Sequence, residues 1–150
     1  MFTRRALLSA SLMTISVLAV PRLWAGTSRV STGKDGTAIQ GYDTHAYWQI
    51  NGPREGADTF TVTWKGVPWH FATQADADAF AAAPDSYAPQ FGGFCTRAMS
   101  LKKVVDGDPE VWRIFQDKLY LFAKPVGGRK FDGNEEEMIA KAQAHWETLD

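Results

Sequence analysis

Cysteine is almost absent from this chain of 150 residues, which contains a single one, Cys95. One cysteine cannot form a disulfide within the chain, so internal covalent cross-links are excluded as a source of stability. The chain also lacks an excess of basic residues, because its net charge is −1 at pH 7, and this argues against a nucleic acid as partner. After the N-terminal region no second apolar run predicts a membrane span.

The first 25 residues have the composition of a secretory signal peptide. Basic Arg4 and Arg5 precede an uncharged, mostly apolar stretch over residues 6–20, and Ala25 is a small residue suited to cleavage. Adjacent arginines are typical of the twin-arginine export route, and general secretion is the alternative. Removal of residues 1–25 also removes Arg22, which leaves 13 basic and 17 acidic residues, a net charge of −4. We expect an exported, periplasmic protein.

Alternation of apolar and polar residues predicts two β-hairpins. The first pairs residues 59–64 with residues 67–71 across a two-residue turn. The second joins residues 111–115 to residues 119–122. We predict no internal repeat. Hairpins with short helices make the expected fold class a small α+β domain.

Two helix starts are predicted from their capping residues. Thr73 followed by Asp76 indicates a helix that runs to Ala83, before a proline. Asn134, with Glu137 at its third helical position, predicts a C-terminal helix.

The domain boundary is expected near residue 38. Residues 26–37 are rich in Ser, Thr and Gly, so they are predicted to be a flexible leader before a domain spanning residues 38–150. Without disulfides, stability must come from aromatic packing. The tryptophans available after signal removal are Trp48, Trp64, Trp69, Trp112 and Trp146.

Several blocks rich in glycine and aromatic residues follow one another between residues 38 and 122. They are Gly41-Tyr42-Asp43-x-x-Ala46-Tyr47, Trp64-x-Gly66-x-x-Trp69-x-Phe71-Ala72, Phe80-x-x-x-Pro84-x-x-Tyr87-Ala88-Pro89, Gly92-Gly93-Phe94-Cys95, Val105-Asp106-Gly107-Asp108-Pro109-Glu110 and Lys118-Leu119-Tyr120-Leu121. In this order they resemble the exported bacterial YHS-domain proteins. The resemblance implies a small α+β fold and does not imply an enzyme.

The resemblance also implies metal handling, with a metal ion or a metal-handling protein as partner. In the YHS domains attached to metal-transporting ATPases, several cysteines ligate metal. This chain has Ala72 at one of the matching positions, and the block around Tyr42 and Asp43 replaces the others. A thiol-rich tetrahedral site is thereby excluded, and Cys95 is left as the only source of thiolate.

Cys95 and Met99 are the principal candidates for a metal site. Residues four apart on a helix lie on one face, so both sulfurs could point at the same ion. A thiolate and a thioether together suit Cu(I). The expected function is binding of such a soft metal for carriage, buffering or delivery. The alternative is a metal-free interaction or accessory domain in which the cysteine and the methionine fill the core.

Three further residues are secondary candidates as metal ligands. His45 lies in the first motif block and is a possible extra copper ligand. His70 alternates with Trp69 on a predicted strand, so it faces away from the core and is either structural or a ligand. Asp43 either caps the turn over residues 44–46 or lines a pocket around Cys95.

A thiol-dependent enzyme is the third hypothesis for Cys95. It would need a base such as His45 or His70 beside the thiol. No known cysteine-enzyme signature surrounds Cys95, so we predict no enzymatic activity and no catalytic residues.

Overall fold

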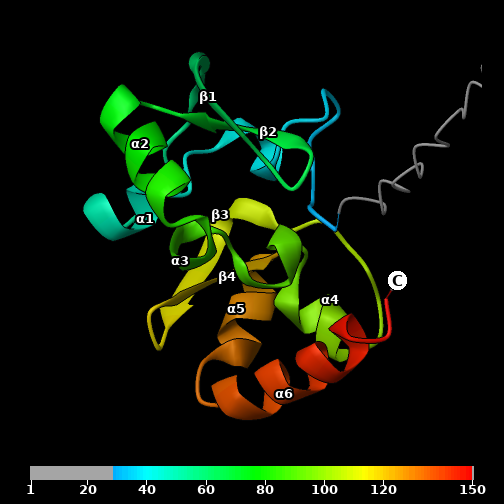
Figure 1. Cartoon of the computed structure of the whole chain (residues 1–150). Coiled ribbons are helices and arrows are strands. Elements are labelled where there is room, and N and C mark those ends of the chain that lie inside the picture. The colour runs from blue at the N-terminus through cyan, green and yellow to red at the C-terminus, as the bar shows by residue number, and fades with distance from the viewer. Residues whose placement is uncertain (1–28, 150) are drawn as a thin grey trace, which may run out of the picture.

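The computed structural model of this protein describes residues 29–149. The predicted signal peptide, with its arginine pair, lies outside the described residues. The described residues form two separate antiparallel hairpins surrounded by short helices (Figure 1). This arrangement confirms the predicted α+β class. Within residues 29–149 no helix is both long enough and apolar enough to cross a bilayer.

The first predicted hairpin is confirmed as β1 (Ala57–Trp64) and β2 (Val67–Phe71). Both turn residues between the strands have positive φ, 50° at Lys65 and 76° at Gly66, which suits the twist of a two-residue hairpin. Along β2, Trp69 and Phe71 are buried and His70 is half-buried, as strand alternation requires. Helix α2 (Gln74–Ala82) follows, and the Thr73 hydroxyl accepts the N–H of Asp76 as predicted.

The second predicted hairpin is confirmed as β3 (Asp108–Phe115) and β4 (Lys118–Phe122). A helix that the sequence did not predict, α5 (Pro125–Phe131), comes next. In the structure α5 packs so closely on β4 that a Cβ at Gly127 would lie 3.1 Å from the Cβ of Phe122. The absence of a side chain at Gly127 therefore allows α5 to pack closely on β4.

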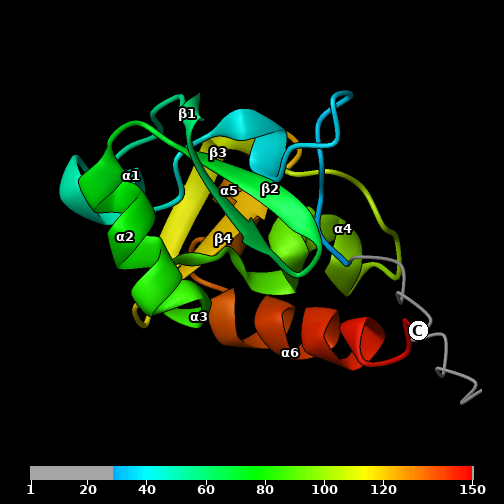
Figure 2. The same cartoon turned by 45° about the horizontal axis from the view of Figure 1, so that its top comes forward.

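The remaining elements are short, apart from the last helix. They are η1 (Ile39–Gly41), α1 (Ala46–Gln49), α3 (Pro84–Tyr87), η2 (Gln90–Gly93), α4 (Thr96–Ser100) and α6 (Glu135–Trp146). Helix α6 runs along one edge of the molecule beside α4 (Figure 2). It begins after Asn134 as predicted, but the predicted cap is wrong, because the Asn134 amide instead donates to the carbonyl of Lys130, 3.3 Å away.

The structure contains an internal repeat, which corrects the expectation that there is none. Strand β3 (Asp108–Phe115) matches β1 (Ala57–Trp64) at a constant offset of 51 residues, and the same offset relates β4 to β2 and the start of α5 to that of α2. Both ladders also have an irregularity at the corresponding place. We call residues 39–82 the first unit and residues 90–131 the second unit.

Matching hydrogen bonds hold the two units in the same backbone path. Asp43 N–H donates to Arg54 O at 2.8 Å in the first unit, and Cys95 N–H donates to Val105 O at 2.7 Å in the second. The N–H of Gly56 donates to Gly41 O at 2.8 Å, and its counterpart in the second unit, the N–H of Gly107, donates to a glycine carbonyl at 3.1 Å. Cys95 therefore occupies the position in the second unit that Asp43 occupies in the first. The offset here is 52 and not 51, because the second unit has one residue fewer between Cys95 and Val105 than the first has between Asp43 and Arg54.

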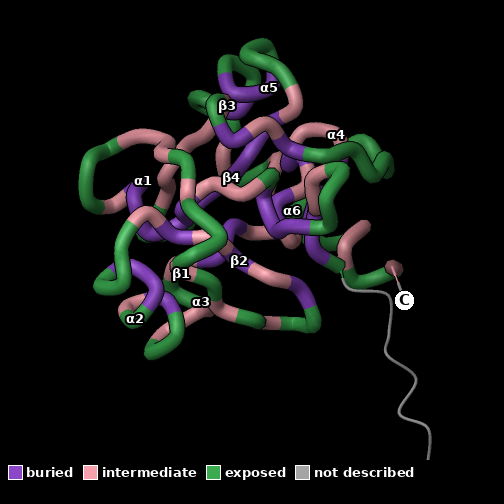
Figure 3. Tube along the Cα trace, turned by 90° about the horizontal axis from the view of Figure 1, so that it is seen from above, coloured by how far each residue is buried: buried purple, intermediate pink, exposed green. Residues whose placement is uncertain are grey.

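Strand β4 separates two hydrophobic clusters and is buried on both faces. Leu119 and Leu121 belong to a cluster with Trp69 and Phe80 of the first unit. Tyr120 and Phe122, on the opposite face, belong to a second cluster. Its other buried members are Phe91, Cys95, Met99, Phe131 and Ala142. In the burial view, β2 and β4 carry buried segments, whereas β1 is largely exposed (Figure 3).

The leader predicted over residues 26–37 is packed into the fold from residue 29 onward, so the boundary at residue 38 is too late. Val30 and Ser31 are buried, and the Ser31 hydroxyl donates to Asp106 at 2.7 Å. The Arg29 guanidinium lies 4.8 Å from the ring centroid of Trp146 and donates to the carbonyl of Trp146 at 2.8 Å. The Ser31 side chain thus joins this segment to the domain.

The repeat predicts that Gly56 and Gly107 are equally intolerant of a side chain. A Cβ would lie 2.5 Å from the backbone of His70 in Gly56→Ala and 2.4 Å from the carbonyl oxygen of Gly93 in Gly107→Ala. We expect each variant to lose about 3 kcal/mol of unfolding free energy in urea titrations followed by tryptophan fluorescence. Gly66→Ala, in open space, should lose only about 1 kcal/mol. Equal losses in Gly66→Ala and Gly107→Ala would contradict the close contact.

Candidate functional site

Cys95 lies at the N-terminus of α4, where it caps the helix. Its Sγ accepts a hydrogen bond from the backbone N–H of Ala98, 3.4 Å away. The residue is 5 % exposed. The same cap in the first unit is made by the Asp43 carboxylate, which accepts the N–H of Ala46, the counterpart of Ala98, at 3.2 Å. The Cys95 sulfur thus accepts a backbone N–H at the start of α4 in the same way that the Asp43 carboxylate accepts one at the start of α1.

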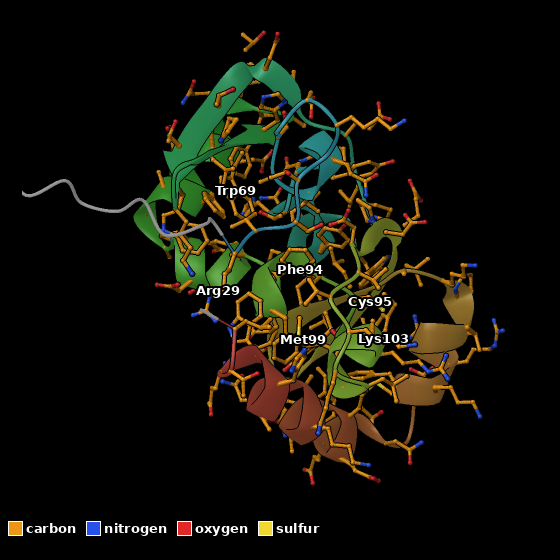
Figure 4. All side chains as sticks on the ribbon, turned by 90° about the vertical axis from the view of Figure 1, so that its right-hand side faces the viewer. Arg29, Trp69, Phe94, Cys95, Met99 and Lys103 are labelled. Atoms are coloured by element: carbon orange, nitrogen blue, oxygen red, sulfur yellow. The ribbon has the colours of Figure 1, made fainter. Side chains whose placement is uncertain are left out.

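Met99 follows Cys95 by one helical turn and belongs to the same buried cluster. The N–H of Met99 donates to the carbonyl of Cys95 at 2.9 Å, and Met99 is fully buried. Side chains on a helix lean toward its N-terminus, so the thioether is directed toward the end of α4 that holds Cys95. Figure 4 shows both residues in the part of the molecule that contains α6, away from Trp69. The structure therefore brings these two candidates together.

Asp43 lies in the first unit, where its carboxylate binds several backbone and side-chain donors. One oxygen accepts the N–H groups of His45 at 2.9 Å and Ala46 at 3.2 Å, which caps the turn that leads into α1. The other accepts the N–H of Ala72 at 3.0 Å and the Arg54 guanidinium at 3.2 Å. This is the turn-capping role predicted for Asp43, and no hydrogen bond of the described residues joins it to Cys95.

His45 forms a second part of this polar network. Its Nδ1 lies 2.7 Å from the carboxylate of Asp76, and its ring packs edge-on against Tyr87 at 4.6 Å. The guanidinium of Arg54 bridges both acids, with Nη2 at 2.7 Å from Asp76. Two buried carboxylates therefore share one arginine, and one of them, Asp76, also binds the His45 ring. Asp76 engages Nδ1 of His45, and among the described residues no hydrogen bond joins the His45 ring to Cys95.

Asp76 is held ionised by its neighbours. Burial raises the pKa of its carboxyl, but hydrogen bonds from Thr73 and His45 and the charge of Arg54 more than offset this, so the pKa is lowered. The Thr73 hydroxyl lies 2.6 Å from the carboxylate. The network therefore stabilises the fold only while Asp76 is charged.

His70, the remaining candidate, lies on β2 apart from both groups. It is half-buried and pairs with Thr61 across the first hairpin. Between residues 29 and 149 no three His, Cys, Asp or Glu side chains form a group able to hold a metal ion. The five sequence candidates thus separate into the Cys95–Met99 pair, the Asp43–His45 network and the isolated His70.

Two residues of the polar network, Arg54 and Asp76, were not among the candidates. Asp76 was noted only as part of a helix cap, and Arg54 stands in a turn-like stretch with no motif. The repeat also had a sequence signal. Gly41-Tyr42-Asp43-Thr44-His45-Ala46 matches Gly93-Phe94-Cys95-Thr96-Arg97-Ala98 at its Gly, aromatic, Thr and Ala positions.

Comparison of the chain with models of protein families, with curated proteins and with solved structures finds no match.

The Asp76 network predicts acid sensitivity. Because its pKa is lower in the folded state, the stability that ionised Asp76 contributes is fully present above its ordinary pKa of 3.8 and is lost as pH falls through the lower folded-state value. We expect Asp76→Asn to lose about 3 kcal/mol at pH 7, since it leaves Arg54 with Asp43 as its one carboxylate and leaves the His45 ring with none. Its unfolding free energy, from urea titrations between pH 2 and 7 (roughly the range where carboxyls titrate), should fall less steeply in acid than that of the wild type.

The exposed Asp58→Asn variant is the charge-matched control for this experiment. If Asp58→Asn and Asp76→Asn give the same acid dependence, the network around Asp76 does not have the role assigned to it.

Proposed function

We propose that this chain is an exported, non-catalytic interaction domain of the YHS type, and that Cys95 serves its structure without binding metal. The observation that carries this proposal is the repeat. Cys95 and Met99 stand where Asp43 and Tyr47 stand in the first unit. In both units the side chain of the first residue accepts the backbone N–H three residues further on, at the start of a short helix, and the second residue is buried in the core. The positions of Cys95 and Met99 are therefore explained by their structural roles, without a bound metal.

The order of the motif blocks supports the YHS assignment, and the signal-like N-terminus supports export. Absence of catalysis is supported by the surroundings of the thiol. The one hydrogen bond of Cys95 Sγ among the described residues is from a backbone amide, and its cluster partners are apolar or aromatic. A thiol nucleophile needs a base within hydrogen-bond reach.

Cu(I) binding for carriage, buffering or delivery is the second candidate function. A specific observation favours it, since a thiol and a thioether lie one turn apart in one buried cluster. Soft sulfur ligands select Cu(I). Asp43, His45 and His70 would add no ligand to that pair, because they belong to other parts of the fold.

The two functions differ in the response to Cu(I). We expect the mature wild-type protein, titrated anaerobically with Cu(I) in the presence of a chromogenic chelator, to retain no stoichiometric metal and to keep its melting temperature. The Cys95→Ala variant should lose about 1 kcal/mol of stability with or without Cu(I), because it loses a helix cap.

Retention of one equivalent of Cu(I) by the wild type, abolished in Cys95→Ser and weakened in Met99→Leu, would instead establish the metal site. Met99→Leu conserves side-chain volume, so it removes the thioether without opening a cavity.

A further inference from the structure

A surface groove lies between α4 and α6, on the far side of α4 from the core. Its volume is about 840 Å³, and it is bounded by the last turn of α4, the end of α5 and the length of α6. The two helices lie side by side at this edge (Figure 2). Neither the sulfur pair nor the Asp43 network contributes to its lining.

The groove is basic although the mature chain is acidic. Arg97, Lys102, Lys130 and Lys141 line it, together with a single acid, Glu137. Glu137 is paired with Lys141 at 2.5 Å, which lowers the pKa of its carboxyl. The other three cations have no ion pair with a described residue. Their charge is therefore available to a ligand.

Apolar side chains form the rest of the surface. Leu101 is 58 % exposed and lines the groove with Met138 and Ala144. Exposed apolar groups that gather beside uncompensated charges are typical of binding surfaces.

The size of the groove and the spread of its cations distinguish between possible ligands. The lining residues in and next to α6 run from Asn134, just before its start, to Thr148, just after its end, which corresponds to about 20 Å at 1.5 Å per residue. The cations come from three helices, so a ligand with one anionic group would leave most of them unmatched. A partner with several carboxylates along a comparable length matches them better.

We propose that the α4–α6 groove binds an acidic, amphipathic helical segment of a partner protein. The apolar side of that helix would cover Leu101 and Met138, and its carboxylates would face Arg97, Lys102 and Lys130. The proposal deepens the interaction function proposed above, and rests on it, by naming the chemistry of the partner.

A designed peptide provides the probe. We suggest a fluorescein-labelled peptide of about four helical turns, with Leu at positions i, i+3, i+4 and i+7 and Glu elsewhere, titrated with the mature wild-type protein. Binding measured by fluorescence anisotropy should weaken about tenfold or more in the double variant Lys102→Glu/Lys130→Glu and in Leu101→Ser, and should weaken as salt is added. The double variant Lys118→Glu/Lys124→Glu carries the same charge change outside the groove and should bind like the wild type.

Three results would overturn the proposal. They are equal affinity in the groove and control double variants, equal binding of a peptide with Lys in place of Glu, and complete competition by dodecanoate, which would indicate a single-headed amphiphile as the ligand. The experiment uses protein with Cys95 intact and no metal. If the peptide does not bind, the groove proposal fails and the structural role proposed for Cys95 is unchanged. If the protein retains Cu(I), the structural role of Cys95 is contradicted and the groove proposal is unchanged.

Discussion

The buried carboxylate of Asp43 is the interaction on which the first unit depends. It accepts donors from the start of α1, from Ala72 at the end of the first hairpin and from Arg54 in the connection before β1. Arg54 extends the network to Asp76 in α2. A fully buried charge is tolerated only when it is surrounded by donors in this way. One side chain therefore fixes the relative positions of a helix, a hairpin and the next helix, and the loss of any donor would leave a buried charge poorly satisfied.

The second unit keeps this backbone path without the charge. Cys95 takes the position of Asp43 and retains only the helix-capping contact, through a weaker sulfur acceptor. Val105 and Gly127 stand where Arg54 and Asp76 stand, so no cation is left buried there. Aromatic packing replaces the polar network, because Phe91, Tyr120, Phe122 and Phe131 form the cluster around the cysteine. The lone thiol belongs to an apolar version of a site that is ionic in the other unit, and the proposed function depends on this correspondence.

The sequence was sufficient to predict the hairpins and the start of α2, since strand alternation, two-residue turns and a Thr cap are local signals. Helix α5 could not be predicted, because Gly127 is selected by its contact with Phe122, which is a tertiary feature. The burial of Val30 and Ser31 could not be predicted either, because it depends on residues distant in the sequence, such as Asp106. For the candidate site, the proximity of Cys95 and Met99 followed from helical spacing. The sequence did not predict that Cys95 and Met99 lie apart from His45 and His70. That separation follows from the repeat, which is hard to detect because few residues match between the two units and their surroundings differ in charge.

The most direct test of the central claim is the rate at which native Cys95 reacts with N-ethylmaleimide as urea is increased at concentrations below the unfolding transition. A thiol that caps α4 inside an aromatic cluster should be protected about 10³-fold or more relative to the unfolded chain. Its reaction should accelerate with urea in parallel with global unfolding, because exposure requires the core to open. Reaction of the native protein at the rate of the unfolded chain, independent of urea, would contradict the structural assignment of Cys95.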